Sequence, residues 1–275
     1  MNRRCRSQSL RYSLKEREGN KTLRSFGIWF RQKVLGKFEI PYLEVFITTK
    51  CNLRCEKCSS CIPYLKAHRD WSKEQFISDL EAVLEKTDRL YRLKLHGGEV
   101  FLNPDLPAII EYVKKQKKIL SVRLTTNGTV IPDQKILEVL RGSRVVVQIS
   151  DYPLENTKRD QLVRLLEKNR IRYVCLRDQV WQDMGDFSLR SSSRYELCSI
   201  RRCTSMYDGR IHVCSRAAVM REEWKTGGMG IPVHTDRRSF RRAMRRLYKK
   251  KDDDACMHCD GDTEFAPLTE AGKQL

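Results

Sequence analysis

The chain has 275 residues, and its 54 Lys and Arg against 35 Asp and Glu give a formal net charge of +19. This length allows one large domain with a small appendage, and a hydrophobic content of 40% excludes a disordered chain. The positive charge favours an anionic partner, although a generally basic protein without such a partner is an equal alternative. No apolar stretch approaches the roughly 18 residues of a spanning helix, and nothing resembles a signal peptide. The eleven cysteines, most of them in close clusters, therefore indicate metal ligands in a reducing cytoplasm.

Residues 1–40 form a basic N-terminal arm in which apolar and basic residues alternate between Phe26 and Lys37. We interpret this segment as a helix packed on the chain's own domain. Peripheral contact with a membrane surface is the alternative.

A strand–helix alternation typical of a parallel α/β domain begins near residue 42. Ser72 and Gln75 form a capping-box pattern at the start of the first helix, which is followed by apolar residues at helical spacing. Further helices are predicted around residues 107–118, 136–140 and 162–166. The predicted strands are 43–48, 93–96, 122–125, 145–149 and 171–176.

No clear sixth strand follows, and residues 177–197 are polar and irregular. Residues 206–213 predict a β-hairpin, because Asp208-Gly209 supplies the positive φ that a tight turn requires. Asp236 then caps a predicted helix with a stripe of paired arginines, which we interpret as a solvated face.

Three cysteines, Cys51, Cys55 and Cys58, follow the first strand in a C-x3-C-x2-C spacing. Three thiolates can hold three irons of a 4Fe–4S cube and leave the fourth iron open, whereas complete sites normally take four. Cys61 is interpreted as a non-ligand, because a fourth thiolate would block that open iron.

Other polar and glycine-rich groups also follow predicted strands. Ligands of parallel α/β folds bind at the carboxyl ends of the strands, so this distribution predicts one site. The residues are Gly97, Gly98 and Glu99 after the second strand, Asn127 after the third, and Gln148 and Ser150 at the end of the fourth.

The order of cysteine loop, Gly-Gly-Glu and Thr-Asn-Gly resembles the radical S-adenosylmethionine (radical SAM) superfamily over residues 42–176. The resemblance implies a partial (β/α)6 barrel, here residues 41–190, with a 4Fe–4S cluster whose open iron binds SAM. It also implies that Gly97, Gly98 and Glu99 hold the SAM amino group, that Gln148 and Ser150 contact the ribose, and that Asn127 lines the pocket. Two departures from the family pattern are Lys57, where an aromatic residue near the adenine is usual, and Val100, where proline is usual.

Five further cysteines lie in residues 191–275, which we interpret as a small cysteine-rich domain. Their spacing is similar to the auxiliary-cluster domain called Twitch, the short form of SPASM, and this resemblance implies a second 4Fe–4S cluster. Four thiolates complete such a cube, so one cysteine is spare, and Cys198 and Cys203 compete for one position. A zinc site is the alternative for paired cysteines of this kind. The candidates are Cys198, Cys203, Cys214, Cys256 and Cys259.

The resemblance implies a cytoplasmic enzyme that cleaves SAM reductively and abstracts a hydrogen from its substrate, with a reductant such as flavodoxin or ferredoxin. We expect a small sugar-like or glycan-linked substrate, which the chain's charge would allow to be anionic, undergoing oxidation or epimerisation. A peptide- or protein-modifying enzyme is the alternative within this class. A basic zinc-bound nucleic-acid-binding protein is the alternative from another class, disfavoured because the interleaved aromatic residues of a stacking platform are missing.

Overall fold

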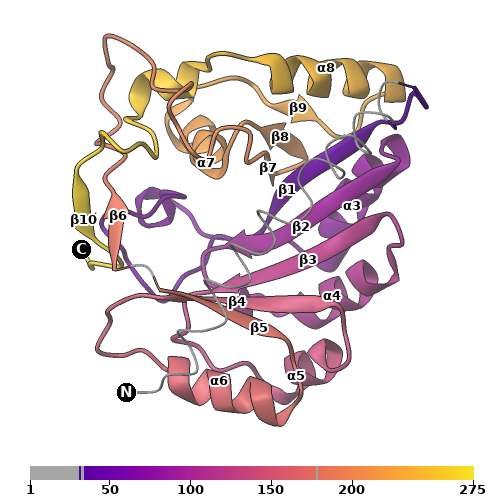
Figure 1. Ribbon diagram of the computed structural model, residues 1–275, viewed down its shortest axis with the longest axis vertical. Coiled ribbons are helices and arrows are strands. Elements are labelled where there is room, and N and C mark those ends of the chain that lie inside the picture. Colours follow the sequence, from indigo (N-terminus) through magenta and orange to yellow (C-terminus); the bar gives the residue numbers. More distant parts are fainter. Residues whose placement is uncertain (1–30, 32–33, 178) are drawn as a thin grey trace.

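The computed structural model describes residues 31, 34–177 and 179–275, so most of the predicted N-terminal arm lies outside the described residues. Five parallel strands form the larger part of one eight-stranded sheet, as the strand–helix alternation predicts (Figure 1). They are β1 (Glu39–Thr48), β2 (Arg89–Gly97), β3 (Ile119–Thr126), β4 (Val145–Asp151) and β5 (Tyr173–Arg177). Four helices connect these strands: α3 (Lys73–Lys86), α4 (Leu106–Lys115), α5 (Gln134–Leu140) and α6 (Arg159–Lys168).

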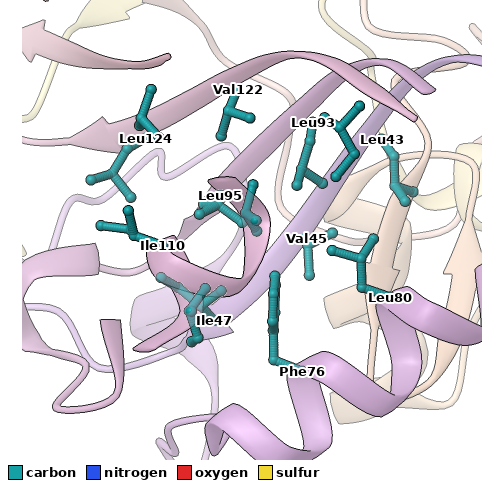
Figure 2. Packing of buried hydrophobic residues seen from close by; sticks show 14 of the residues in the cluster. Leu43, Val45, Ile47, Phe76, Leu80, Leu93, Leu95, Ile110, Val122 and Leu124 are labelled. Carbon is teal, nitrogen blue, oxygen red and sulfur yellow. The ribbon is translucent and has the colours of Figure 1, made fainter. Parts of the chain in front are cut away.

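The core lies between this sheet and the helices on its outer side. Alternate residues of a strand point to opposite faces, and on β1 the side chains of Leu43, Val45 and Ile47 point toward α3 and α4 (Figure 2). Phe76 and Leu80 of α3 meet them and are almost fully buried. The other face of each strand is therefore free to carry polar side chains toward a site.

Local signals explain where the helices begin. Ser72 caps α3, and its hydroxyl accepts a hydrogen bond from the Gln75 backbone N–H at 3.2 Å. The reciprocal half of the predicted capping box is not formed, because the Gln75 side chain donates instead to Asp208 at 3.1 Å. Helix α3 is thereby attached to the hairpin turn that follows the core.

The predicted hairpin is confirmed, but its first strand also joins the parallel sheet, which was not predicted. β7 (Ser205–Tyr207) pairs parallel with β1, and β8 (Arg210–His212) and β9 (Ile231–Pro232) continue the same sheet antiparallel. The predicted Asp208-Gly209 turn is confirmed, with φ of +48° and +65°. The sheet ends at β5 and β9, and this strand pairing does not by itself establish the expected partial barrel.

The C-terminal region packs over the open side of the sheet. Helix α7 (Ser215–Trp224) follows the hairpin, and α8 (Arg237–Lys249) begins at Asp236, which caps it as predicted. The last residues return to the core, where β10 (Leu268–Glu270) pairs with β6 (Val180–Gln182). Among the described residues, no helix combines the length and apolarity needed to cross a membrane. The predicted domain boundary at residue 190 stays a prediction.

Candidate active site

A cavity of about 420 Å³ lies at the carboxyl ends of the parallel strands. Residues from the cysteine loop (residues 51–58) and from the ends of β2, β3 and β4 line it together, as the sequence pattern predicts. The predicted site residues that line it are Cys51, Cys55, Cys58, Gly97, Gly98, Asn127, Gln148 and Ser150.

The cysteine loop is held from two sides. Asn52 accepts a hydrogen bond from the Asn127 side chain at 3.0 Å and donates to the Thr129 hydroxyl at 2.7 Å, which attaches the loop to the end of β3. On the other side the C-terminal tail pairs with the loop, and the Gln274 amide donates to the Cys55 sulfur at 3.4 Å. The sequence gives no local signal for this second attachment, because 219 residues separate the two partners.

The three loop thiols lie close together in a buried setting. Burial, with a smaller contribution from the neighbouring thiols, raises the pKa of Cys51 to about 12 and that of Cys55 to about 11. Burial also raises the pKa of Cys58. Hydrogen bonds from the backbone N–H groups of residues 60–62 act in the opposite direction and lower this pKa. A metal that binds here must therefore displace protons, and these N–H groups would then stabilise the thiolate charge.

Gly97 and Gly98 are required by close backbone approach. An added Cβ at Gly97 would lie 1.9 Å from the Thr48 carbonyl oxygen, and one at Gly98 would lie 2.1 Å from the Lys50 carbonyl oxygen. The backbone N–H of Gly98 also donates a hydrogen bond to the Thr48 carbonyl at 3.0 Å. The two glycines thus let the cysteine loop sit directly against the end of β2.

Glu99 is not among the residues that line the cavity, and the SAM contact that the resemblance implies for it stays a prediction. Its side chain is fully buried and accepts hydrogen bonds from the backbone N–H of Asn127 at 2.8 Å and of Phe101 at 3.1 Å. Burial raises the pKa of Glu99 to about 7, although these bonds act in the opposite direction. Glu99 therefore ties the end of β2 to the loop after β3 from behind the cavity wall.

We predict that Glu99→Gln destabilises the chain most at mildly acidic pH. One of the two backbone N–H groups would face the new amide NH2, at a cost of about 1–3 kcal/mol in the free energy of unfolding. In the wild type, the stabilisation from protonated Glu99 is fully present below its ordinary pKa of 4.5 and is lost as the pH rises through about 7. That loss amounts to about 3 kcal/mol at about 1.4 kcal/mol per pKa unit.

The measurement is urea unfolding of metal-free protein at pH 5 and pH 8 under reducing conditions. The stability gap between wild type and Glu99→Gln should shrink at the higher pH. The control is Glu138→Gln, because Glu138 is exposed and accepts only from Gln134 on its own helix. A gap that stays constant with pH would contradict the prediction.

A second polar group on the inner face of β1 and β2 was not predicted. Glu44, Lys94 and His96 line the same cavity, and Glu44 accepts from Lys94 at 2.9 Å. Burial acts to raise the pKa of Glu44, but Lys94 and His96 help to outweigh it, and the pKa is lowered to about 2. Burial lowers the pKa of His96 to about 4, so its imidazole is neutral near pH 7. The alternation of β1, with Tyr42, Glu44 and Phe46 opposite to the core residues, is the signal that could have found this group.

Four of the five C-terminal cysteines line one small apolar cavity, and we call them the C-terminal cysteine group. Burial raises the pKa of Cys214 well above its ordinary value, and its three partner thiols raise it further. Backbone N–H groups donate to three of the sulfurs, from Ala217 to Cys214, from Gly261 to Cys259 and from Asp262 to Cys198, at 3.3–3.4 Å. The group is Cys198, Cys214, Cys256 and Cys259.

Cys203 lies elsewhere. It lines the larger cavity, where burial raises its pKa to about 11 and the nearby Glu44 carboxylate adds to this effect. Cys214 lines both cavities and so places the C-terminal cysteine group beside the larger one. Within the described part of the chain, no three His, Cys, Asp or Glu side chains are arranged to hold a single metal ion.

The sequence of residues 45–150, from the middle of β1 to the end of β4, matches the radical SAM superfamily. Residues 45–150 form a radical SAM domain. Radical SAM enzymes use a 4Fe–4S cluster and SAM, and in this stretch the three loop cysteines line the cavity.

Among curated proteins, part of the chain is similar to GTP 3′,8-cyclases. The Clostridium perfringens (strain SM101 / Type A) protein is 25% identical over 170 residues, which are 59% of this chain and 51% of that protein. The Aquifex aeolicus protein is 30% identical over 131 residues, which are 45% of this chain and 39% of that protein. The chain thus spans about half the length, or less, of the curated relatives that it matches.

Solved structures share the fold over more of the chain. BtrN in complex with AdoMet and 2-DOIA superimposes with a TM-score of 0.55 at 17% identity, covering 86% of this chain and 98% of BtrN. Histidine-tagged anSMEcpe with bound AdoMet gives a TM-score of 0.50 at 15% identity, covering 77% and 81%. At these identities the likeness concerns the fold alone.

Proposed function

We propose that this chain is a radical SAM enzyme with two 4Fe–4S clusters that oxidises a small, polar substrate without negative charge. When bound, the loop cluster and SAM supply a 5′-deoxyadenosyl radical that takes a hydrogen atom from the substrate. Cys51, Cys55 and Cys58 would hold the first cluster, and the C-terminal cysteine group the second. The observation that carries the proposal is that Cys214 belongs to a four-thiol group and also lines the cavity.

The chain's own residues position SAM in this proposal. The backbone of Gly97 and Gly98 lines the cavity beside the cysteine loop and offers carbonyl oxygens to the SAM amino group. Glu99 acts as a positioning residue, because it fixes the loops on both sides without reaching the cavity. Gln148 and Ser150 remain the proposed ribose contacts.

The charges that line the cavity disfavour an anionic substrate. Lys94 is paired with Glu44 at 2.9 Å, and Lys57 is paired with Asp183 at 2.9 Å. Asp262 adds a further carboxylate to the lining, so no excess of positive charge faces the cavity despite the net charge of +19. This lining suits a polyol or aminated sugar better than the triphosphate of GTP, on which the named relatives act.

The position proposed for the second cluster, at the C-terminal cysteine group, suits an enzyme that oxidises its substrate. A substrate radical that loses one more electron and a proton completes a two-electron oxidation, and the C-terminal cysteine group lies at the cavity wall where such an electron would leave. BtrN, whose fold this chain shares, was crystallised with 2-DOIA and AdoMet, which supports a search among ligands of that kind.

The test is formation of 5′-deoxyadenosine by anaerobically reconstituted protein with dithionite and SAM. Candidate aminocyclitols, free sugars, GTP and peptides are each added, and the mass of each candidate is followed. Polyols or aminated sugars should stimulate 5′-deoxyadenosine formation and lose two mass units. Stimulation by GTP or by peptides alone would overturn the substrate class, and no 5′-deoxyadenosine under any condition would overturn the enzyme activity.

A further inference from the structure

Arg216 is a buried arginine between the cysteine loop and the C-terminal cysteine group. Its residue is only 4% exposed, and it lies in the first turn of α7, two residues after Cys214. One guanidinium nitrogen, Nη1, donates to the Cys61 sulfur at 3.2 Å. The other, Nη2, donates to the carbonyls of Met184 and Gly185 at 3.3 and 3.0 Å. Its Nε has no hydrogen-bond partner.

The partners of this guanidinium are neutral. Its hydrogen-bond acceptors are a fully buried thiol, Cys61, and two backbone carbonyls. The nearby carboxylate of Asp183 forms its own ion pair with Lys57 at 2.9 Å rather than with Arg216. A buried cation without a direct ion-pair partner is costly, and an anion closer to it would reduce that cost.

Both cysteine groups lie within reach of this charge. Arg216 lines the small cavity together with the four thiols of the C-terminal cysteine group. Through Cys61 it also contacts the apolar cluster in which Cys51 and Cys58 pack. The backbone N–H of Cys61 in turn donates to the Cys58 carbonyl at 2.9 Å, which places the guanidinium one residue contact from the loop.

We propose that Arg216 is a shared counter-ion for the two cysteine groups and raises the reduction potential of the cluster at each. The part that concerns the C-terminal cysteine group rests on the function proposed above. A thiolate-bound 4Fe–4S cluster becomes more negative on reduction, and a nearby fixed positive charge stabilises the reduced form. Arg216 thereby acts as a positioning and tuning residue, and Cys61 is the neutral acceptor that holds its guanidinium in place.

The first test measures midpoint potentials of full-length reconstituted protein by redox titration followed by electron paramagnetic resonance. In Arg216→Met both midpoint potentials should become more negative by at least about 59 mV. For a one-electron couple this shift corresponds to a tenfold change in the redox equilibrium constant. Arg216→Lys keeps the charge and should recover part of the shift. Unchanged potentials in Arg216→Met with full iron content would overturn the proposal.

The second test needs no cluster. In metal-free protein Arg216 forms no direct ion pair with a described residue, and only the Phe187 ring, 4.4 Å away, faces its charge. Arg216→Met should therefore unfold at the same urea concentration as wild type or higher, whereas in loaded protein it should unfold earlier. Arg144→Met is the control. Arg144 donates to three backbone carbonyls and also has an unpaired Nε, but it is only half-buried, at the other end of β4, so its charge stays partly hydrated and the loss of its hydrogen bonds dominates. This control should lose stability in both forms. An equal loss for metal-free Arg216→Met would show a purely structural arginine and overturn the proposal.

Failure of the proposed function would look different. If the C-terminal cysteine group holds no cluster, the wild type contains about four irons per chain and shows a single potential. That potential should still move in Arg216→Met, because Arg216 contacts Cys61, which lies in the same packed cluster as the loop residue Cys58.

Discussion

Gly97→Ala is expected to lower the free energy of unfolding by more than about 3 kcal/mol. Its φ is +145°, a conformation that residues with a side chain rarely adopt, and the added Cβ would lie 1.9 Å from the Thr48 carbonyl oxygen. That oxygen belongs to the β1 backbone and accepts from Gly98, so it cannot move without breaking the contact between the two strand ends. Urea unfolding of metal-free protein measures the effect.

Gly142→Ala separates the clash from the backbone conformation. Gly142 also has a positive φ, +64°, but nothing lies within 4 Å of the position of its added Cβ. Its substitution should cost only about 1–2 kcal/mol, the usual penalty of a left-handed residue. Similar losses for the two variants would contradict the close approach of β1 and β2 that defines the cavity.

Cys198→Ala and Cys214→Ala are each expected to lose about half of the bound iron, from about eight to about four per chain. Both residues belong to the C-terminal cysteine group, so either substitution leaves the second cluster incomplete. The loop cysteines are untouched, and cleavage of SAM to 5′-deoxyadenosine should persist while oxidation of the substrate is lost. Iron and sulfide analysis of anaerobically purified protein measures the first effect.

Cys203→Ala is the matched control and settles the competition between Cys198 and Cys203. Cys203 lines the larger cavity beside Glu44 and stands outside the C-terminal cysteine group, so its removal should leave the iron content unchanged. Loss of iron from Cys203→Ala, with full iron in Cys198→Ala, would reverse the assignment.

Much of the α/β core could be predicted from local signals. Short apolar runs predict β1 to β5, and single residues, Ser72 and Asp236, predict the starts of two helices. The structure confirms these strands and both caps. The strand order then brings the cysteine loop to the same edge as the ends of β2 to β4, which follows from parallel topology alone.

The features that were missed depend on partners far away in the chain. β7 has only three residues and is a strand because β1 offers it an edge. The attachment of Gln274 to the cysteine loop likewise has no local pattern. The hydrogen bonds that the Glu99 carboxylate accepts from the backbone N–H groups of Phe101 and Asn127 are also not visible in the motif alone.

The most direct measurement is iron and acid-labile sulfide per chain in anaerobically purified wild type and in a Cys51/Cys55/Cys58→Ala triple variant. Two clusters, one on the cysteine loop and one on the C-terminal cysteine group, predict about eight irons falling to about four. About four irons in the wild type and none in the variant would leave the C-terminal cysteine group without a cluster. One zinc per chain with little iron would contradict both cluster assignments and favour a zinc-binding protein of another class.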